Sequence, residues 1–133
     1  MGVVVDTSVF IGAEHGAVDL GALLEPDERY YIAAVTVSEL LTGVAMAKTP
    51  AVRVHRLTWA ESLIQAVPLL PFDLDVARTY AEVWSQGLKA GGRAGSNAHD
   101  LQIAATAITH GFAVMTANVK DFEKVPGVRV VSM

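Results

Sequence analysis

The chain has 133 residues, of which 52% are hydrophobic, so it can bury a core of its own, and intrinsic disorder is excluded as a description of the whole. It contains no cysteine, which excludes disulfide scaffolds, cysteine zinc sites and thiol nucleophiles. Ten Lys and Arg against 14 Asp and Glu give a formal net charge of −4, so the chain lacks the global positive charge typical of nucleic-acid-binding proteins.

The length predicts a single domain spanning residues 1–133. The amino-terminal segment has no basic stretch ahead of an apolar one, and no apolar run approaches the ~18 residues of a membrane span. We therefore expect a cytoplasmic protein without a membrane partner.

Short runs rich in β-branched and aromatic residues predict the strands. The first, Gly2-Val3-Val4-Val5, is apolar throughout and suits a strand buried on both faces of a parallel sheet. The last follows Pro126-Gly127 and is expected at an edge of the sheet. The predicted strands are residues 2–5, 30–33, 69–72, 113–116 and 128–131.

Between these strands, apolar residues at helical spacing predict helices over 36–48, 52–66, 73–88 and 97–110. Asp73 is expected to cap the third of them, and Gly111 to end the fourth. Strands that alternate with helices predict an α/β fold, with a central parallel sheet flanked by helices on both faces.

Residues 87–96 form a glycine-rich stretch that carries Lys89 and Arg93. The stretch follows a predicted helix rather than a strand, and it lacks the Gly-Lys-Ser/Thr ending of a phosphate-binding loop. It therefore predicts a mobile connection, from which Lys89 and Arg93 could still contact a phosphate backbone.

Several polar residues are expected at one edge of the sheet. Asp6 directly follows the first strand, and Glu39 and Asp100 fall in the first turns of two predicted helices. A crossover helix runs antiparallel to its strands, so its amino end lies at the edge where the parallel strands end. The strand at 113–116 should bring three further polar residues to this edge: Thr116, Asn118 and Asp121.

Each of these acids also has a purely local interpretation. Thr36-Val37-Ser38-Glu39 matches a capping box, in which Glu39 would bind a backbone N–H at the start of its own helix. The helix dipole favours an acid at Asp100 without any ligand. Independent caps, however, need not converge on the end of a buried strand.

Carboxylates that share one edge repel each other unless a cation neutralises them, and hard oxygen ligands suit Mg²⁺ or Mn²⁺. Such ions can activate a water molecule and stabilise the leaving oxygen of an in-line displacement. Phosphodiester hydrolysis follows as a hypothesis. Four histidines show no zinc-site spacing and are interpreted as surface or packing residues: His15, His55, His99 and His110.

The sequence resembles the PIN-domain ribonucleases of the VapC type over nearly its whole length, and Pro71-Phe72-Asp73 ahead of a helix also matches. The most specific part is the Asp-Xaa-Xaa-Ile-Ala-Ala pattern. Four segments carry the likeness: Val5-Asp6-Thr7-Ser8, Val37-Ser38-Glu39-Leu40, Asp100-Leu101-Gln102-Ile103-Ala104-Ala105-Thr106-Ala107 and Thr116-Ala117-Asn118-Val119-Lys120-Asp121-Phe122.

This resemblance implies a PIN-like α/β domain that cuts RNA with Mg²⁺ or Mn²⁺. It also implies a toxin that forms a homodimer and is blocked by a cognate VapB-type antitoxin. Asp6, Glu39 and Asp100 match the family's metal-site acids, with Asp6 and Asp100 as direct ligands. Ser8 and Thr116 match the polar positions that order the site.

The fourth position of the site is open. Many relatives have an aspartate where this chain has Asn118, and others have one where it has Asp121. An asparagine can bind a metal through its carbonyl oxygen but brings no charge, so either residue can complete the site.

Two other functions remain open at this stage. A noncatalytic PIN-like module would bind RNA or a protein through the same acidic pocket. A phospho-acceptor domain of the receiver type would share the length and the parallel sheet, but its usual acidic pair after the first strand is missing, because Val4 and Val5 precede a single Asp6.

Overall fold

The computed structural model describes residues 2–89 and 98–133. Within these residues five strands form one sheet in which all neighbouring strands are parallel. In spatial order the strands are β3 (Leu69–Leu70), β2 (Arg29–Ala33), β1 (Gly2–Val5), β4 (Ala113–Thr116) and β5 (Val130–Ser132). The predicted strands are thus confirmed within a few residues, and β5 lies at an edge as expected.

The sheet order separates two of the possible fold families. Receiver-type domains have the strand order 2-1-3-4-5, whereas the order here is 3-2-1-4-5. The phospho-acceptor alternative therefore fails on topology.

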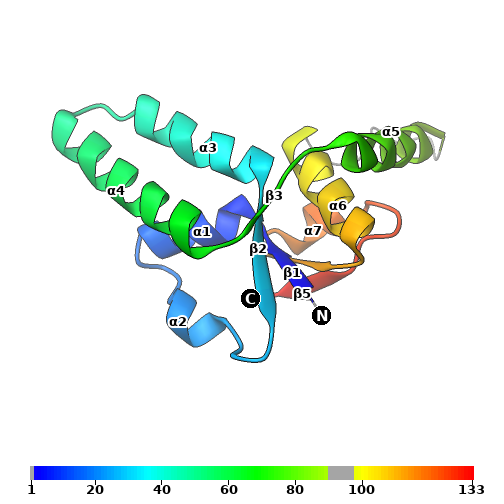
Figure 1. The fold of residues 1–133 in the computed structure, drawn as a ribbon, viewed down its shortest axis with the longest axis horizontal. Helices are drawn as coiled ribbons and strands as arrows, with labels where there is room; N and C mark the ends of the chain where they lie inside the picture. The colour runs from blue at the N-terminus through cyan, green and yellow to red at the C-terminus, as the bar shows by residue number, and fades with distance from the viewer. Residues whose placement is uncertain (1, 90–97) are drawn as a thin grey trace.

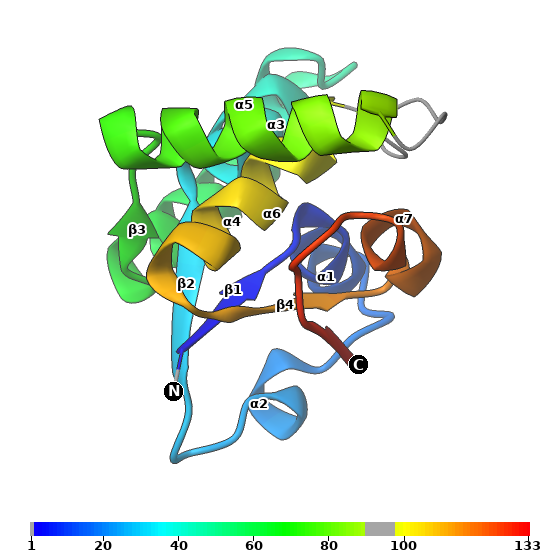
Figure 2. The same cartoon turned by 90° about the vertical axis from the view of Figure 1, so that its right-hand side faces the viewer.

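Helices cover both faces of the sheet, as predicted (Figure 1). One layer contains α1 (Thr7–Glu14), α3 (Ala34–Ala45) and α4 (Pro50–Ala66), and the other contains α5 (Leu74–Lys89), α6 (Ala98–His110) and α7 (Val119–Glu123). The short helix α2 (Leu20–Leu23) lies near the opposite end of the sheet from α5, as Figure 2 shows.

Each layer has its own hydrophobic core, because neighbouring side chains of a strand point to opposite faces. Val3 and Val5 of β1 pack into the core of α1, α3 and α4, which contains Phe10 and Leu63. Val4 packs into the second core, on the side of α5, α6 and α7. The central strand is therefore held from both sides, and its carboxyl end is fixed.

Three helices were not predicted: α1, α2 and α7. The helix α1 follows Asp6 without a break, and the Asp6 side chain makes no cap hydrogen bond, so the usual signal of a helix start is missing. The helices α2 and α7 have only four and five residues.

The glycine-rich stretch is partly helical. The helix α5 continues through Lys89, so the prediction of an irregular segment from residue 87 is wrong for its first three residues. A helix tolerates a glycine at a cost of about 1 kcal/mol, which neighbouring turns can offset. The rest of that stretch, including Arg93, and the expected helix start at Asn97 lie outside the described residues.

Two predicted helix ends are confirmed. Asp73 Oδ1 accepts a hydrogen bond of 3.1 Å from Val76 N at the start of α5. Gly111 follows α6 with a φ of +71°, a left-handed conformation that favours glycine. None of the helices in the described part of the chain is long and apolar enough to cross a membrane.

We expect Asp73→Ala to lower the free energy of unfolding by about 1 kcal/mol, because Val76 N–H loses its acceptor. Urea denaturation measures this loss. Asp73→Asn is the matched control, since it keeps a capping oxygen and should remain close to wild type. Equal losses for Ala and Asn would show that the cap is not the source of the stability.

Candidate active site

The parallel sheet brings Asp6 and Thr116 side by side. Val5 of β1 is in register with Met115 of β4, and Asp6 N donates a hydrogen bond of 2.8 Å to Met115 O. Thr116 Oγ1 donates to Asp6 Oδ2 at 2.9 Å. Both side chains are buried. The two residues are 110 positions apart in the sequence, yet the ends of their strands place them in direct contact.

A second hydroxyl fixes the same carboxylate. Ser8 Oγ donates to Asp6 Oδ2 at 2.6 Å. The two hydroxyls are themselves held by the loop after β4, because Ala117 N donates to Ser8 Oγ at 3.1 Å and Asn118 N donates to Thr116 Oγ1 at 2.9 Å. These bonds set the orientation of the Asp6 carboxylate, and none of them involves Oδ1.

Glu39 does not cap its own helix. The helix α3 begins at Ala34, so Glu39 lies in the second turn rather than in the predicted first turn. Thr36 lies inside the helix and is fully buried, so the capping-box interpretation is wrong. Instead, Glu39 Oε1 accepts a hydrogen bond of 2.7 Å from Thr7 Oγ1 of α1.

Asp100 lies in the first turn of α6, as predicted. Burial raises the pKa of its carboxyl from 3.8 to about 6, with further contributions from the charges of Asp6, Asp121 and Glu39, while His99 acts in the opposite direction. The three like charges that act on Asp100 come from α7, α3 and the end of β1. The raised pKa of Asp100 thus indicates that four carboxylates lie in one region of the structure.

These side chains line one cleft at the carboxyl ends of the strands. Its volume is about 210 Å³, and its lining includes Asp6, Ser8, Glu39, Asp100, Asn118 and Asp121. Thr116 is fully buried and contacts the cleft through Asp6. The structure therefore brings together the acids that the sequence analysis selected, and Asn118 and Asp121 both lie beside them.

The cleft offers oxygen ligands of the kind that hard divalent cations prefer, namely carboxylates with hydroxyls behind them. Among the described residues, no three His, Asp or Glu side chains form a group that could hold a metal ion as they stand. The donor chemistry fits Mg²⁺ or Mn²⁺, and the side chains would need to draw closer to surround an ion.

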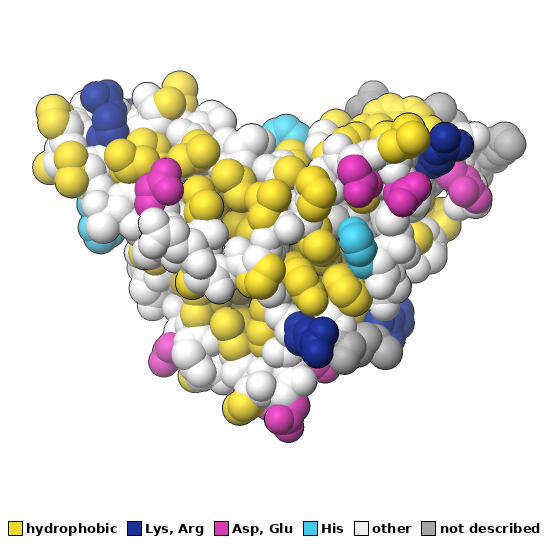
Figure 3. All heavy atoms as spheres, in the orientation of Figure 1, with side chains coloured by type: hydrophobic (Ala, Val, Ile, Leu, Met, Phe, Trp, Pro, Cys, Tyr) yellow, Lys and Arg dark blue, Asp and Glu magenta, His cyan; other side chains and the backbone are white. Residues whose placement is uncertain are grey.

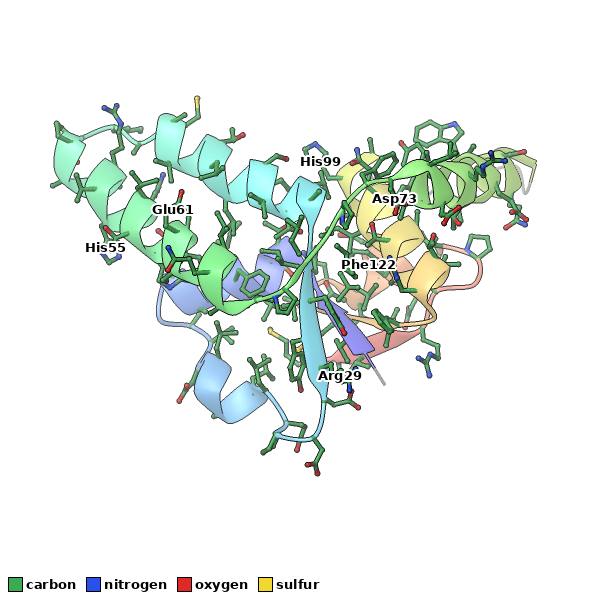
Figure 4. The ribbon with its side chains drawn as sticks, in the orientation of Figure 1. Arg29, His55, Glu61, Asp73, His99 and Phe122 are labelled. Atoms are coloured by element: carbon green, nitrogen blue, oxygen red, sulfur yellow. The ribbon has the colours of Figure 1, made fainter. Side chains whose placement is uncertain are left out.

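Sequence reasoning missed three residues that surround Glu39. Thr7 lines the cleft and binds Glu39, Thr36 binds Thr7, and His99 contacts Glu39. His99 Nδ1 lies 3.3 Å from Glu39 Oε2, a contact that was not predicted, although its exposed side chain agrees with the interpretation of the histidines as surface or packing residues. Figure 4 shows it at the amino end of α6, beside the start of α3. The signal for Thr7 was its place between Asp6 and Ser8, but the contact with Glu39 depends on α1, which was not predicted.

The chain is similar to known proteins over nearly its whole length. The family model described as PIN domain matches residues 3–128. Ribonuclease VapC1 of Rickettsia felis is 35% identical over 133 residues, which cover 100% of this chain and 97% of that protein.

Solved structures show the same likeness. A chain in the crystal structure of VapBC-5 from Mycobacterium tuberculosis, a member of the VapBC family of toxin-antitoxin systems, has a TM-score of 0.77 and 34% identity, with 99% of this chain and 97% of that chain covered. A chain of VapBC2 from Rickettsia felis, bound to a promoter DNA fragment, has a TM-score of 0.87 over 100% of this chain and 99% of that chain. Its identity of 20% supports the fold alone. The family model and these relatives together establish that the chain belongs to the PIN-domain family and, within it, to the VapC proteins.

Proposed function

We propose that the protein is a metal-dependent endoribonuclease, the toxin of a VapBC-type pair, and that it hydrolyses RNA phosphodiester bonds in the acidic cleft. The observation that carries this proposal is the convergence of Asp6, Glu39, Asp100 and Asp121 at the carboxyl ends of the strands. The name of the relative Ribonuclease VapC1 supports the same reaction.

The cofactor is Mg²⁺ or Mn²⁺, with Asp6 and Asp100 as direct ligands and Glu39 as a third. Four carboxylates in one cleft favour the binding of a cation, because each negative charge makes ionisation of the neighbouring carboxyl groups less favourable. When bound, a divalent ion supplies Lewis-acid activation of water and neutralises charge at the phosphate.

The side chains of this chain prepare the cleft for that ion and for the RNA. Ser8 and Thr116 hold the Asp6 carboxylate in one orientation before any ligand arrives. Glu39, held by Thr7, helps to hold or orient the attacking water. Asn118 or Asp121 completes the site from the loop after β4 and from α7.

The partners are RNA, a VapB-type antitoxin and a second copy of the chain. The antitoxin follows from the solved relatives, which are VapBC complexes. A homodimer is supported by exposed large hydrophobic side chains, which include Leu69, Phe72 and Leu74. Figure 3 shows hydrophobic side chains gathered on the face around β3 and the start of α5, and such patches commonly mark protein interfaces.

We expect the purified protein to cut cellular RNA into discrete fragments with Mg²⁺ or Mn²⁺, and to lose this activity in EDTA. Asp6→Asn and Asp100→Asn should reduce cleavage to the level of the EDTA control, because each removes a charged ligand. Asp75→Asn is the matched control, since Asp75 is an exposed acid of α5 outside the cleft. Gel analysis of RNA fragments measures the outcome, and circular dichroism checks that each variant is folded.

Cleavage at the wild-type rate by folded Asp6→Asn protein would contradict the assignment of the site. Folded wild-type protein that binds RNA but does not cut it, whichever divalent metal is supplied, would favour the noncatalytic alternative.

We also expect the metal-free protein to lose stability as the pH rises from about 4 to about 6. The pKa of Asp100 is raised in the folded state, so the folded protein binds this proton more tightly than the unfolded chain does. The contribution of Asp100 to stability is therefore greatest while the carboxyl is protonated in both states, and it is lost as the pH rises from about 4 through the folded-state pKa of about 6. The melting temperature of Asp100→Asn minus that of wild type should increase over this range in EDTA.

Thermal unfolding of both proteins at several pH values measures this difference, with Asp75→Asn as the control for the loss of an exposed acid. Addition of Mg²⁺ above pH 6 should raise the melting temperature of wild type more than that of Asp100→Asn. A melting-temperature difference between the two proteins that does not change with pH would show that the pKa of Asp100 is not raised in the folded protein.

A further inference from the structure

Two buried threonines connect Glu39 to the interior of the protein. Thr7 Oγ1 of α1 lies 2.7 Å from Glu39 Oε1 and 3.0 Å from Thr36 Oγ1, and both Glu39 and Thr36 belong to α3. Thr7 is 5% exposed and Thr36 is fully buried. The contact therefore lies at the inner wall of the cleft, away from solvent.

The directions of these two hydrogen bonds follow from the number of protons available. A carboxylate can only accept, so Thr7 must use its single hydroxyl proton toward Glu39. The hydrogen bond between the two hydroxyls then takes its proton from Thr36. The result is a chain of two hydrogen bonds, from Thr36 to Thr7 and from Thr7 to Glu39, which ends on a charged acceptor, the stronger kind of hydrogen bond.

Two other threonines of the helices behave differently. Thr106 Oγ1 donates to Gln102 O at 2.7 Å, and Thr42 Oγ1 donates to Ser38 O at the same distance, so both bind the carbonyl one turn earlier in their own helix. That is the ordinary local bond of a helical threonine. Thr7 instead reaches from α1 to a carboxylate on α3, which is a bond between helices.

Glu39 is also contacted from the solvent side. His99 Nδ1 lies 3.3 Å from Glu39 Oε2, and the histidine side chain is 52% exposed. Exposed ion pairs contribute little because water screens them. The buried hydroxyl is therefore the contact that can hold a long, flexible glutamate in one conformation, and a side chain ordered in advance avoids that entropic cost during the reaction.

We propose that Thr7, supported by Thr36, is a positioning residue that fixes the Glu39 carboxylate in the cleft. This inference rests on the proposed function, because it assigns Thr7 to the same site. Thr7 also lines the cleft, and the role assigned to its hydroxyl is to act through Glu39.

The test compares four variants of the full chain. Thr7→Val removes the hydroxyl at nearly constant volume, Thr36→Val removes its support, and Thr7→Ser keeps the hydroxyl. Thr106→Val is the matched control, because it removes a buried threonine hydroxyl that binds only its own helix.

We expect Thr7→Val to lower kcat for RNA cleavage by about 10- to 100-fold, the usual effect of losing a residue that orients a catalytic group, with KM for RNA unchanged. Thr36→Val should have the same effect to a smaller degree. Thr7→Ser should restore kcat to near the wild-type value, and Thr106→Val should leave it unchanged. Loss of activity in Thr7→Val without rescue by Thr7→Ser would overturn the proposal, because a packing defect would then explain the loss.

A second measurement needs neither metal nor activity. In EDTA, Thr7→Val should lower the melting temperature of wild type, but lower it less in a Glu39→Met background, where no carboxylate remains to accept the hydrogen bond. Thr106→Val should cost the same in both backgrounds. Equal losses from Thr7→Val in both backgrounds would overturn the proposal even if the enzyme is active. Unequal losses in a protein that cuts no RNA would support the positioning contact while rejecting the ribonuclease function.

Discussion

Repulsion among carboxylates is the constraint on which the rest of the structure depends. Burial, together with the charges of Asp6, Asp121 and Glu39, raises the pKa of Asp100 to about 6, so the cleft is an unfavourable place for charge in the metal-free protein. The fold offsets part of this cost with hydroxyl donors: Ser8 and Thr116 bind Asp6, and Thr7 binds Glu39. The remaining charge is what a divalent cation would neutralise.

The two hydrophobic cores hold this strained arrangement in place. Glu39 is carried by α3, which packs in one core, and Asp100 by α6, which packs in the other. Between them, β1 is buried on both faces and ends at Asp6. Because each acid sits on an element fixed by its own core, the carboxylates cannot separate without loss of packing. The packing of the two cores thus offsets the repulsion among the carboxylates and keeps them close together.

Local sequence pattern was sufficient for the residues that follow regular elements. Asp6 and Thr116 lie at the ends of unbroken apolar strands, and the start of α6 places Asp100 correctly. The direction of a crossover helix placed Glu39 at the right edge, although Glu39 lies in the second turn of α3 rather than the first. The competing capping-box interpretation was wrong, because α3 begins at Ala34 and Glu39 binds Thr7 instead. The contacts of Thr7 and His99 with Glu39 could not be predicted, because they depend on how α1 and α6 approach α3.

The most direct test of the central claim is a crystal structure with Mn²⁺, whose anomalous scattering locates the ion independently of any activity. The account predicts a peak in the cleft within about 2.5 Å of carboxylate oxygens of Asp6 and Asp100, and its loss in Asp6→Asn crystals grown in the same way. A peak elsewhere on the protein, or an empty cleft at a Mn²⁺ concentration that supports RNA cleavage, would contradict the account.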